Sequence, residues 1–434
     1  MPTMAGETFA FADYDCVGFD LDNTLCEYRI KPMVQMIYDV LAEYLISRHD
    51  YAADHLRRPI DFEFCQRGLV LDVERGNVLK IDGNGRVLRA THGTRFMSDH
   101  EIVTAYGPTR TWSIAEVFAR NFLDTWNGPM SERIRPLLDF FDISVSLVFG
   151  RCVDGIDDAA GQSPSGGYNV WPDVHKGLLN MYTRDNFSSD IGEFFPNIKS
   201  TPSLYYNRCP EYVIDWLKEL KRNSKVFLVS GSHVDYANFS AVQSLGTNWK
   251  ELFDIAVFYA RKPGFFSSDR PFYSTDSLMS KECDIVEDIH LGNIYSQGNW
   301  NQLYNLFKKE TGKSNPKCLY VGDNVLQDIV APSKFCGIDT IAVIEEMKLD
   351  CNNIDLNPDI DILRPNKWSS YFVDSEKNDV SIWSSFITHG KLCVPSIKCL
   401  AKLPVIHQFT TFSKNKYFNG FYPCIPNSLY KILK

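Results

Sequence analysis

The segment Asp20–Thr24 (DLDNT) carries two carboxylates two positions apart, directly after a short apolar run. Such a pair suits phosphoryl transfer, because one carboxylate can attack phosphorus while the other handles the proton of the leaving oxygen. The pattern D-x-D-x-T is weak on its own, since chance produces it in about one chain in ten of this length. An Asx-turn or a helix cap in a solvated loop explains the same residues equally well.

Three later segments also place polar residues directly after apolar runs. Ser230–Ser232 (SGS) offers hydroxyls that can bind a phosphoryl oxygen, and Lys262 offers a cation that can neutralise the nucleophile and the transferring group. Asp323, with Asp328 five positions on, offers hard oxygen ligands for magnesium. Each residue alone can be a helix cap, a surface cation or a turn residue. Four such segments in this order favour one shared active site.

The apolar runs before these segments have the length and composition of buried strands. They are Tyr14–Asp20, Val226–Val229, Ile255–Phe258 and Cys318–Val321. Amphipathic helices are predicted before two of them, at Glu211–Lys221 and Trp300–Thr311. Strands that alternate with helices predict an open α/β sheet, in which ligands bind at the carboxyl ends of the strands.

The first two polar segments, at Asp20 and Ser230, are too far apart for a loop, so the intervening chain is predicted to form a domain of its own. Within it, Gly68–Gly93 has the alternation of a β-meander, with a tight turn at Gly83–Gly85. Gly155–Gly167 is predicted to be a surface loop. A second loop-rich stretch is predicted from Phe265 to Gly298, and the last eighty or so residues show no clear period.

Bulk composition indicates an ordinary folded protein. Of the 434 residues, 44% are hydrophobic, 13% aromatic and 23% charged. The net charge of −9, from 45 basic and 54 acidic residues, gives no support to a nucleic-acid polymer as partner. Twelve cysteines are scattered without a C-x-x-C pair, so we expect mostly buried free thiols in a reducing compartment.

The beginning of the chain argues against a targeting peptide. Its first twenty residues hold Glu7, Asp13, Asp15 and Asp20 but no Lys or Arg. The best apolar run, Ile143–Phe149, is too short to span a bilayer. We therefore predict a cytoplasmic protein without a membrane partner.

The order D-x-D-x-T, hydroxyl, Lys, G-D-x-x-x-x-D resembles that of haloacid dehalogenase phosphatases. Within that superfamily, the chain is similar to the cytosolic purine 5'-nucleotidase family over nearly its whole length, the large insertion included. The stretches that carry this resemblance are Val17–Leu25, Arg67–Asp82, His92–Gly93, Arg261–Phe266, Tyr295–Asn299 and Tyr320–Ile329.

The resemblance implies a haloacid dehalogenase-like fold: a doubly wound, Rossmann-like parallel sheet with a large inserted cap domain. Residues 1–30 and 205–350 would form the catalytic core, and residues 31–204 the cap over the active site. Residues 351–434 would form a C-terminal extension packed on the core. The family likeness also suggests a homo-oligomer, a dimer or larger.

The resemblance also implies catalytic roles. Asp20 would be the nucleophile that forms an aspartyl-phosphate, and Asp22 would protonate the leaving group and then activate the hydrolytic water. Ser230 would bind a phosphoryl oxygen. Lys262 would clamp Asp20 and the phosphate.

A Mg²⁺ cofactor is implied in the same way. Its ligands would be the Asp20 carboxylate, the backbone carbonyl of Asp22 and Asp323, with waters completing an octahedron. Asp328 and Thr24 would support this cluster from outside.

The implied substrate is a small phosphorylated molecule, a nucleoside 5'-monophosphate by family likeness. Purine nucleotidases bind the base through an Arg and an Asp on a cap helix, and the corresponding positions here are His175 and Leu179. Neither supplies the same contacts, so a purine monophosphate does not follow from the sequence. Ser232 does match the family, and it is a candidate for substrate binding with His175. His233 is interpreted as a structural histidine.

Two other functions fit the same motifs. The chain could keep the fold as a catalytically weak binding or regulatory protein, which the altered cap helix favours and the intact carboxylates oppose. It could also transfer phosphate to an acceptor, or act on a phosphate ester that is not a nucleotide, because the same aspartyl intermediate serves these reactions. A panel of substrates separates these possibilities.

Overall fold

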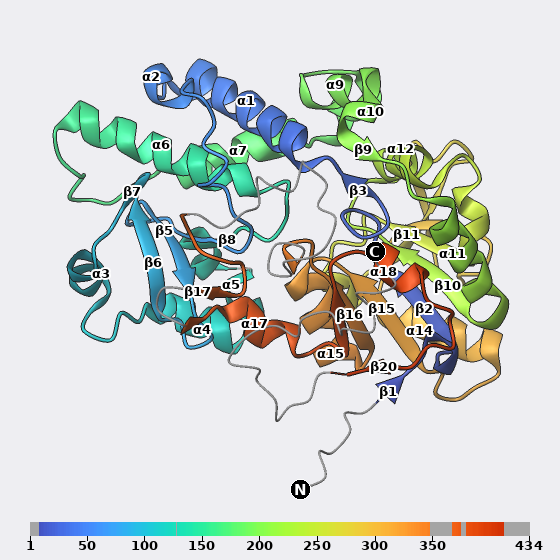
Figure 1. Ribbon diagram of the computed structural model, residues 1–434. Coiled ribbons are helices and arrows are strands. Elements are labelled where there is room, and N and C mark those ends of the chain that lie inside the picture. The colour runs from blue at the N-terminus through green and yellow to red at the C-terminus, as the bar shows by residue number, and fades with distance from the viewer. Residues whose placement is uncertain (1–7, 127, 348–366, 375–378, 412–434) are drawn as a thin grey trace, which may run out of the picture.

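A computed structural model describes residues 8–126, 128–347, 367–374 and 379–411. Within these residues, nine strands form a large sheet in the order β13-β12-β14-β11-β10-β2-β15-β16-β19 (Figure 1). The strands, in chain order, are β2 (Cys16–Phe19), β10 (Lys225–Val229), β11 (Ile255–Phe258), β12 (Phe272–Thr275), β13 (Glu282–Val286), β14 (Ile294–Gln297), β15 (Cys318–Gly322), β16 (Asp339–Val343) and β19 (Leu392–Val394). Neighbouring strands from β14 to β19 pair parallel, whereas β12 pairs antiparallel with both β13 and β14 at one edge.

The order of the large sheet reverses at its central strand, β2. Later strands add outward on one side as β10, β11 and β14, and on the other side as β15, β16 and β19. Every residue of β2 is buried, and Gly18 is required there because a Cβ would lie 2.2 Å from the Phe227 ring. The four strands predicted from apolar runs are confirmed, and so is the α/β class.

Helices cover both faces of the large sheet. Alternate residues of each strand point to opposite faces, so apolar residues of neighbouring strands contact helices on either side. The Phe19 ring contacts Trp216 of α11 (Glu211–Asn223), whereas Phe227 contacts Phe307 of α14 (Trp300–Thr311). Both predicted helices are therefore confirmed. The other described helices of this part are α12 (Val234–Leu245), α13 (Gly264–Ser267), α15 (Ala331–Cys336), α17 (Ile382–Ile387) and α18 (Ile397–Ala401), with the 3-10 helices η1 (Phe11–Asp13) and η3 (Trp249–Leu252) and the π-helix η4 (Val325–Val330).

Between β2 and β10, the part of the chain from β3 to β9 builds a separate layer of structure, here called the insert. It leaves through β3 (Glu27–Tyr28) and returns through β9 (Tyr206–Asn207), and these two strands pair antiparallel. Its sheet has the order β7-β6-β5-β4-β8, from β4 (Val70–Asp72), β5 (Asn77–Ile81), β6 (Val87–His92), β7 (Arg95–Phe96) and β8 (Ile134–Pro136). The predicted β-meander is thus confirmed as β4, β5 and β6.

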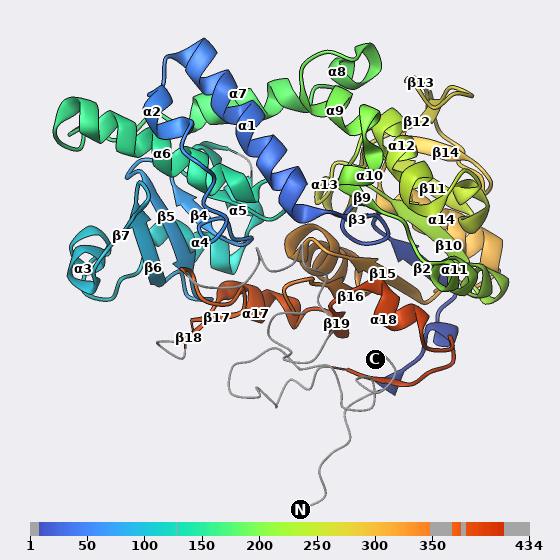
Figure 2. The ribbon, with the colours of Figure 1, turned by 45° about the horizontal axis from the view of Figure 1, so that its top comes forward.

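Helices lie over one side of the insert sheet (Figure 2). The long ones are α1 (Ile30–His49), α6 (Ile143–Ala160) and α7 (Trp171–Met181), which pack on one another, and α6 also contacts β5 and β6. The others are α2 (Ala53–Leu56), α3 (Asp99–Tyr106), α4 (Ser113–Arg120), α5 (Leu123–Trp126), α8 (Arg184–Ser189), α9 (Phe194–Ser200) and α10 (Pro202–Tyr205), with the turn η2 (Pro129–Glu132).

Two loop predictions were wrong in part. The predicted surface loop Gly155–Gly167 begins later, because α6 continues to Ala160; Gly155 lies within the helix, where a Cβ would come within 2.9 Å of Ala52. The predicted loop-rich stretch Phe265–Gly298 contains β12, β13 and β14. Its strands are short and partly exposed at the sheet edge, so they lack the continuous apolar run by which the central strands were recognised.

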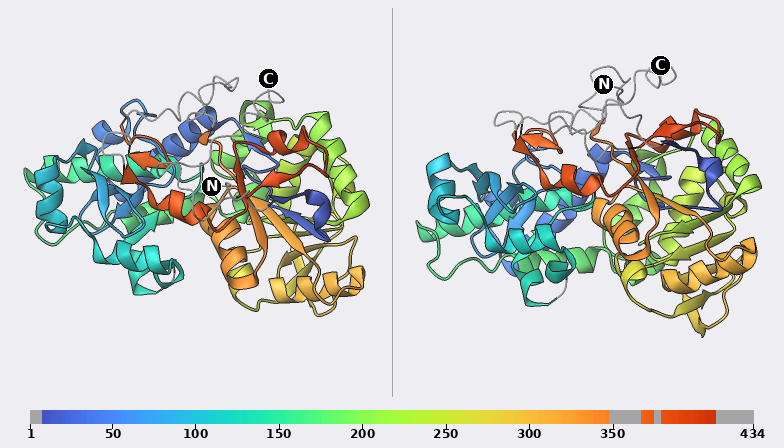
Figure 3. Two further views of the ribbon diagram at one scale, coloured as in Figure 1. Left: turned by 60° about the horizontal axis from the view of Figure 1, so that its bottom comes forward. Right: turned by 90° about the horizontal axis from the view of Figure 1, so that it is seen from below.

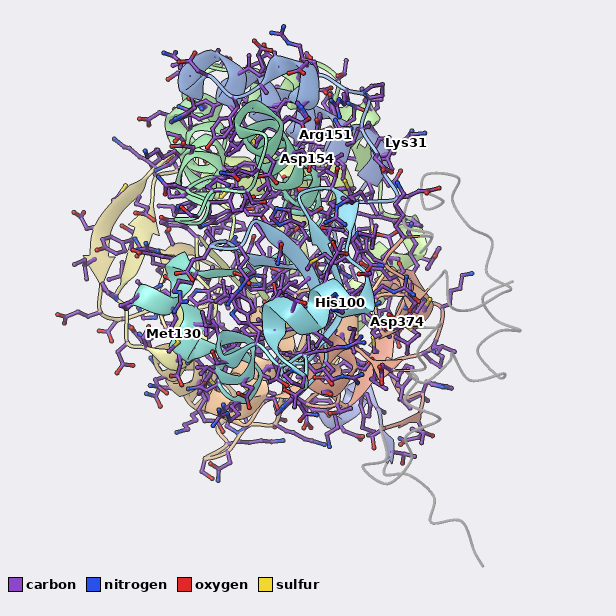
Figure 4. The ribbon with its side chains drawn as sticks, turned by 90° about the vertical axis from the view of Figure 1, so that its left-hand side faces the viewer. Lys31, His100, Met130, Arg151, Asp154 and Asp374 are labelled. Carbon is purple, nitrogen blue, oxygen red and sulfur yellow. The ribbon has the colours of Figure 1, made fainter. Side chains whose placement is uncertain are left out.

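The described C-terminal residues lie against both sheets (Figure 3). β19 extends the large sheet beside β16, and β20 (Phe409–Thr410) pairs with β1 (Thr8–Phe9). β17 (Val373–Asp374) pairs with β18 (Asp379–Val380) next to the insert. The Arg89 guanidinium donates to both oxygens of Asp374, at 2.6 and 2.8 Å, and Asp374 is labelled in Figure 4.

Buried lysine and tryptophan side chains also join this segment to the insert. Lys80 Nζ donates to the carbonyl oxygens of Trp368 (2.8 Å), Val373 (2.7 Å) and Ser370. The Trp383 indole donates to the Gly68 carbonyl oxygen at 2.8 Å. The C-terminal segment therefore contacts the insert as well as the large sheet.

The prediction of mostly buried free thiols is confirmed for the described part of the chain. The ten cysteines there are free, and most are buried. None of the described helices is long and apolar enough to cross a membrane.

Candidate active site

The carboxyl ends of β2, β10 and β15 fix the first candidate residues by backbone hydrogen bonds. The Asp20 amide donates to the Val321 carbonyl oxygen at 2.8 Å, and the Ser230 amide donates to that of Val257 at 2.9 Å. Each of these residues therefore continues the sheet ladder one step beyond its strand. Asp323 directly follows β15, so it lies at the same edge as Asp20 and Ser230. The site lies next to the point where the strand order reverses, where parallel α/β sheets bind ligands.

Lys262 links Asp20, the candidate nucleophile, to Asp328, the candidate supporting residue. Its Nζ donates to Asp20 Oδ1 at 2.8 Å, to Asp328 Oδ1 at 2.6 Å and to the Tyr320 hydroxyl at 3.2 Å. Burial alone would lower the pKa of Lys262, but the carboxylates of Asp20 and Asp328 outweigh it and hold the pKa well above its ordinary value. The site therefore contains a fixed positive charge beside Asp20.

Asp22 lies in a different environment, among hydroxyl groups. Its Oδ1 accepts from the Tyr28 hydroxyl at 2.6 Å, and its Oδ2 accepts from Ser232 Oγ at 2.6 Å and from Ser230 Oγ at 3.3 Å. Burial, together with the charge of Asp20, raises the pKa of Asp22 above its ordinary value. Burial raises the pKa of both carboxylates, but their partners differ: Asp20 accepts from a cation, which favours its ionised form, whereas Asp22 accepts only from hydroxyl groups among the described side chains.

The acidic residues here fit a divalent cation. Asp20, Asp323 and Asp328 offer oxygens that lie within 4.8 Å of one another, and all three side chains are buried. Burial raises the pKa of Asp20 and of Asp323, and neighbouring carboxylates add to it. A dication relieves such repulsion, and carboxylate oxygens are the ligands that Mg²⁺ prefers. Asp328 already accepts from Lys262 and from the Asn324 amide (3.0 Å), so its predicted role is support.

Two site residues were not recognised from the sequence. The Arg67 guanidinium, contributed by the insert, donates to Asp323 Oδ2 at 2.9 Å and to both oxygens of Glu346, at 2.9 and 2.5 Å. Asp139, also on the insert, accepts a hydrogen bond from Asn23 Nδ2 at 3.1 Å, next to Asp22. The insert therefore reaches the carboxylate cluster at two places.

The remaining candidates lie less centrally. Thr24 is buried, and its hydroxyl has no hydrogen-bond partner among the residues that the structure describes. Ser232 is at the site, where it bonds Asp22.

His175 stacks on Trp171, with ring centroids 5.5 Å apart, and no contact with the carboxylate cluster is recorded for it in the described chain. Leu179 is 59% exposed. The substrate-binding role of His175 thus remains a prediction. His233 stacks on Tyr259 at 4.0 Å.

Replacing Asp139 with Asn is expected to stabilise the protein at alkaline pH. Burial and the nearby Asp142 raise the pKa of Asp139 to about 7. Because ionisation is harder in the folded state, wild-type stability falls as the pH rises from about 4 to about 7. The Asn side chain does not ionise, so the variant does not lose this stability. It also keeps Oδ1, which accepts hydrogen bonds from the Asn23 side chain and the Phe141 backbone amide.

Urea unfolding in EDTA measures this effect. Asp139→Asn should gain roughly 2 kcal/mol over wild type at pH 8, a value discounted for partial solvent exposure, and about a third of that at pH 5. Asp124→Asn, at an exposed carboxylate of the insert, is the control. An equal gain at both pH values would show that the ionisation of Asp139 is not the cause.

Comparison with known proteins agrees with the motif resemblance. A family model described as the 5' nucleotidase family matches residues 5–363. Two proteins named 5'-nucleotidase domain-containing protein 1, from Homo sapiens and Bos taurus, are 34% and 33% identical to the chain over 451 and 449 aligned positions, which cover 96% of each protein. The human 5'-nucleotidase domain-containing protein 2 is 23% identical over 355 positions, 79% of this chain and 63% of that protein.

Proposed function

The chain belongs to the 5' nucleotidase family, within the haloacid dehalogenase superfamily, and from this premise we propose that it is a magnesium-dependent phosphatase acting on nucleoside 5'-monophosphates. The observation that carries the proposal is the contrast between two neighbouring carboxylates. Asp20 is paired with the buried Lys262, whereas Asp22 is bonded by hydroxyl groups. Lys262 favours the ionised form of Asp20 that a nucleophile needs, whereas burial and the charge of Asp20 raise the pKa of Asp22, as a proton donor needs.

In the proposed first step, a carboxylate oxygen of Asp20 attacks the phosphorus of the substrate. The bond from phosphorus to the leaving oxygen breaks, and Asp22 gives its proton to that oxygen. The product is an aspartyl-phosphate on Asp20 and a free alcohol. Lys262 and the Ser230 hydroxyl offset the negative charge on the phosphoryl oxygens.

In the second step, water replaces Asp20 on phosphorus. Asp22, now ionised, takes a proton from the water as its oxygen attacks, and the bond between phosphorus and Asp20 breaks. Inorganic phosphate leaves, and both carboxylates return to their starting states. Tyr28 and Ser232 hold Asp22 in place through both steps, since they donate to its two oxygens.

The cation would be held by the carboxylates of Asp20 and Asp323 and by the backbone carbonyl of Asp22. Bound Mg²⁺ supplies positive charge that draws electron density from the phosphoryl oxygens. Asp328 and Lys262 would keep the Asp20 carboxylate oriented, because Lys262 bridges the two acids.

The insert, residues 31–204, is proposed as the cap over this site, with residues 1–30 and 205–350 as the core. Support comes from the Asn23–Asp139 and Asp323–Arg67 contacts, which bring the insert to the catalytic edge of the large sheet. The surface that selects the leaving group would then come from the insert.

A substrate panel tests the proposal. Purified protein is incubated with purine and pyrimidine 5'-monophosphates, sugar phosphates and a generic aryl phosphate, in Mg²⁺ or in EDTA, and inorganic phosphate is measured. We expect release from at least one nucleotide in Mg²⁺, loss of that release in EDTA, and recovery when Mg²⁺ is restored. Folded protein that releases phosphate from none of them at saturating Mg²⁺ contradicts the proposal and favours a binding or regulatory role.

A further inference from the structure

Arg67 is a buried cation of the insert, with only 1% of its surface exposed. Its Nη1 donates to Asp323 Oδ2 at 2.9 Å. Its Nε and Nη2 donate to the two oxygens of Glu346, at 2.9 and 2.5 Å. A planar guanidinium held on both oxygens of one carboxylate has a fixed orientation, so the direction of its third hydrogen bond is fixed as well.

Aromatic rings restrict the same guanidinium further. The Arg67 guanidinium carbon lies 4.5 Å from the centre of the Phe140 ring and 5.5 Å from that of Tyr371. Phe140 follows Asp139 on the insert, and Tyr371 belongs to the C-terminal segment. Arg67 is therefore held by the core, the insert and the C-terminal segment together.

Asp323, the acceptor of that third bond, is also part of the carboxylate group that fits a cation. Its carboxylate can rotate about the bond to Cβ unless something holds one oxygen. Arg67 holds Oδ2, and through it the plane of the carboxylate. Metal affinity depends strongly on such outer contacts, because they set the direction of the ligand's lone pairs.

We propose that Arg67 is a positioning residue for the metal site: it orients Asp323, so that cation binding in the core depends on a side chain of the insert. The inference rests on the magnesium dependence of the proposed function. It goes beyond that function because it assigns a role to a residue outside the proposed set of metal ligands and catalytic groups.

Arg67→Met has two effects on the affinity for Mg²⁺, and they act in opposite directions. Removing a cation near the site makes the site more negative, which by itself strengthens binding of Mg²⁺. Releasing Asp323 from its fixed orientation weakens that binding. Arg67→Lys keeps the charge but loses the bidentate fork, so only the orientation effect remains.

The test measures binding of Mg²⁺ alone to the full-length protein by titration calorimetry, without substrate. We expect the dissociation constant to rise about 10- to 100-fold in Arg67→Met, and by at least as large a factor in Arg67→Lys, where no loss of charge opposes the orientation effect. The Mg²⁺ concentration that half-saturates phosphate release should rise in parallel. Unchanged or tighter binding in Arg67→Met overturns the proposal, and if that variant does not fold, unchanged binding in Arg67→Lys overturns it.

Arg151→Met is the matched control. Arg151, labelled in Figure 4, is another buried arginine of the insert, and its guanidinium donates to the carbonyl oxygens of Arg58 (2.6 Å) and Pro59 (2.7 Å) and not to a carboxylate of the site. This variant should lose stability and keep the wild-type affinity for Mg²⁺. An equal loss of affinity in Arg151→Met would mean that Arg67 acts only through the stability of the insert.

The calorimetry also separates this inference from the proposed function. Wild-type protein that binds Mg²⁺ but hydrolyses nothing contradicts the function, while the Arg67 variants still report on positioning. Wild-type protein that hydrolyses nucleotides, with Arg67 variants of unchanged affinity, contradicts the positioning role alone.

Discussion

Asp20→Asn is expected to reduce phosphate release by roughly 1000-fold or more at saturating Mg²⁺. The amide has no anionic oxygen to attack phosphorus, so the aspartyl-phosphate cannot form. The protein should stay folded, because Lys262 keeps its 2.6 Å contact with Asp328 and the amide removes one buried negative charge. The measurement is the rate of phosphate release on the best substrate of the panel, with circular dichroism to check folding.

Asp15→Asn is the control for this change. Asp15 directly precedes β2, at the end opposite Asp20, and accepts from Lys313 Nζ at 2.5 Å and from the Lys317 amide at 2.8 Å. The same substitution there should leave the rate within about twofold of wild type, since surface substitutions far from a site have small effects. Equal rates of phosphate release in wild type and Asp20→Asn would show that Asp20 is not the nucleophile.

Lys262→Met is expected to lower the maximal rate about 100-fold or more, and added Mg²⁺ should not restore it. The lost charge lies on Nζ between Asp20 and Asp328, a place that a cation bound at Asp323 does not fill. The variant should also lose about 3–5 kcal/mol of stability, because it leaves buried carboxylates without their lysine. Rates are measured across a Mg²⁺ series, and stability by denaturant unfolding.

Lys221→Met controls for the loss of a lysine as such. Lys221 Nζ donates to the carbonyl oxygens of Glu251 (2.8 Å) and Phe253 (2.9 Å), at the end of α11. Its replacement should leave the maximal rate and the Mg²⁺ dependence unchanged. If excess Mg²⁺ instead restores the activity of Lys262→Met, the lysine serves metal binding and not the transferring group.

The core of the large sheet could be predicted because burial leaves a local record in the sequence. β2, β10, β11 and β15 are apolar along their length, since both faces of a parallel sheet are covered. The edge strands β12 and β13 have exposed residues and carry no such run. β19 could not be placed either, because its three residues, Leu392–Val394, are too few for a recognisable apolar run.

The candidate site was predictable where its residues directly follow strands. Asp20, Ser230 and Asp323 come at fixed positions after apolar runs, and the strand order brings them together. Arg67 and Glu346 follow no such rule, because their pairing is set by how the insert packs on the core. Arg67 lies within the stretch Arg67–Asp82 that carried the family resemblance, which was the one signal that could have drawn attention to it. No motif or apolar run next to Asp139 in the sequence indicates that it belongs to the site.

The position of β2 at the centre of the large sheet has a consequence for synthesis of the chain. β2 is the first strand of the large sheet to leave the ribosome. Its neighbours in the sheet, β10 and β15, begin only at Lys225 and Cys318. At 5–20 residues per second, β2 waits about 10–40 s for β10 and about 15–60 s for β15. During that time a fully apolar strand has no partner, and contacts of such long range form slowly. Nascent chains arrested before β15 should therefore bind chaperones and aggregate when released, whereas the insert, whose sheet is formed within residues 70–136, can fold while it emerges.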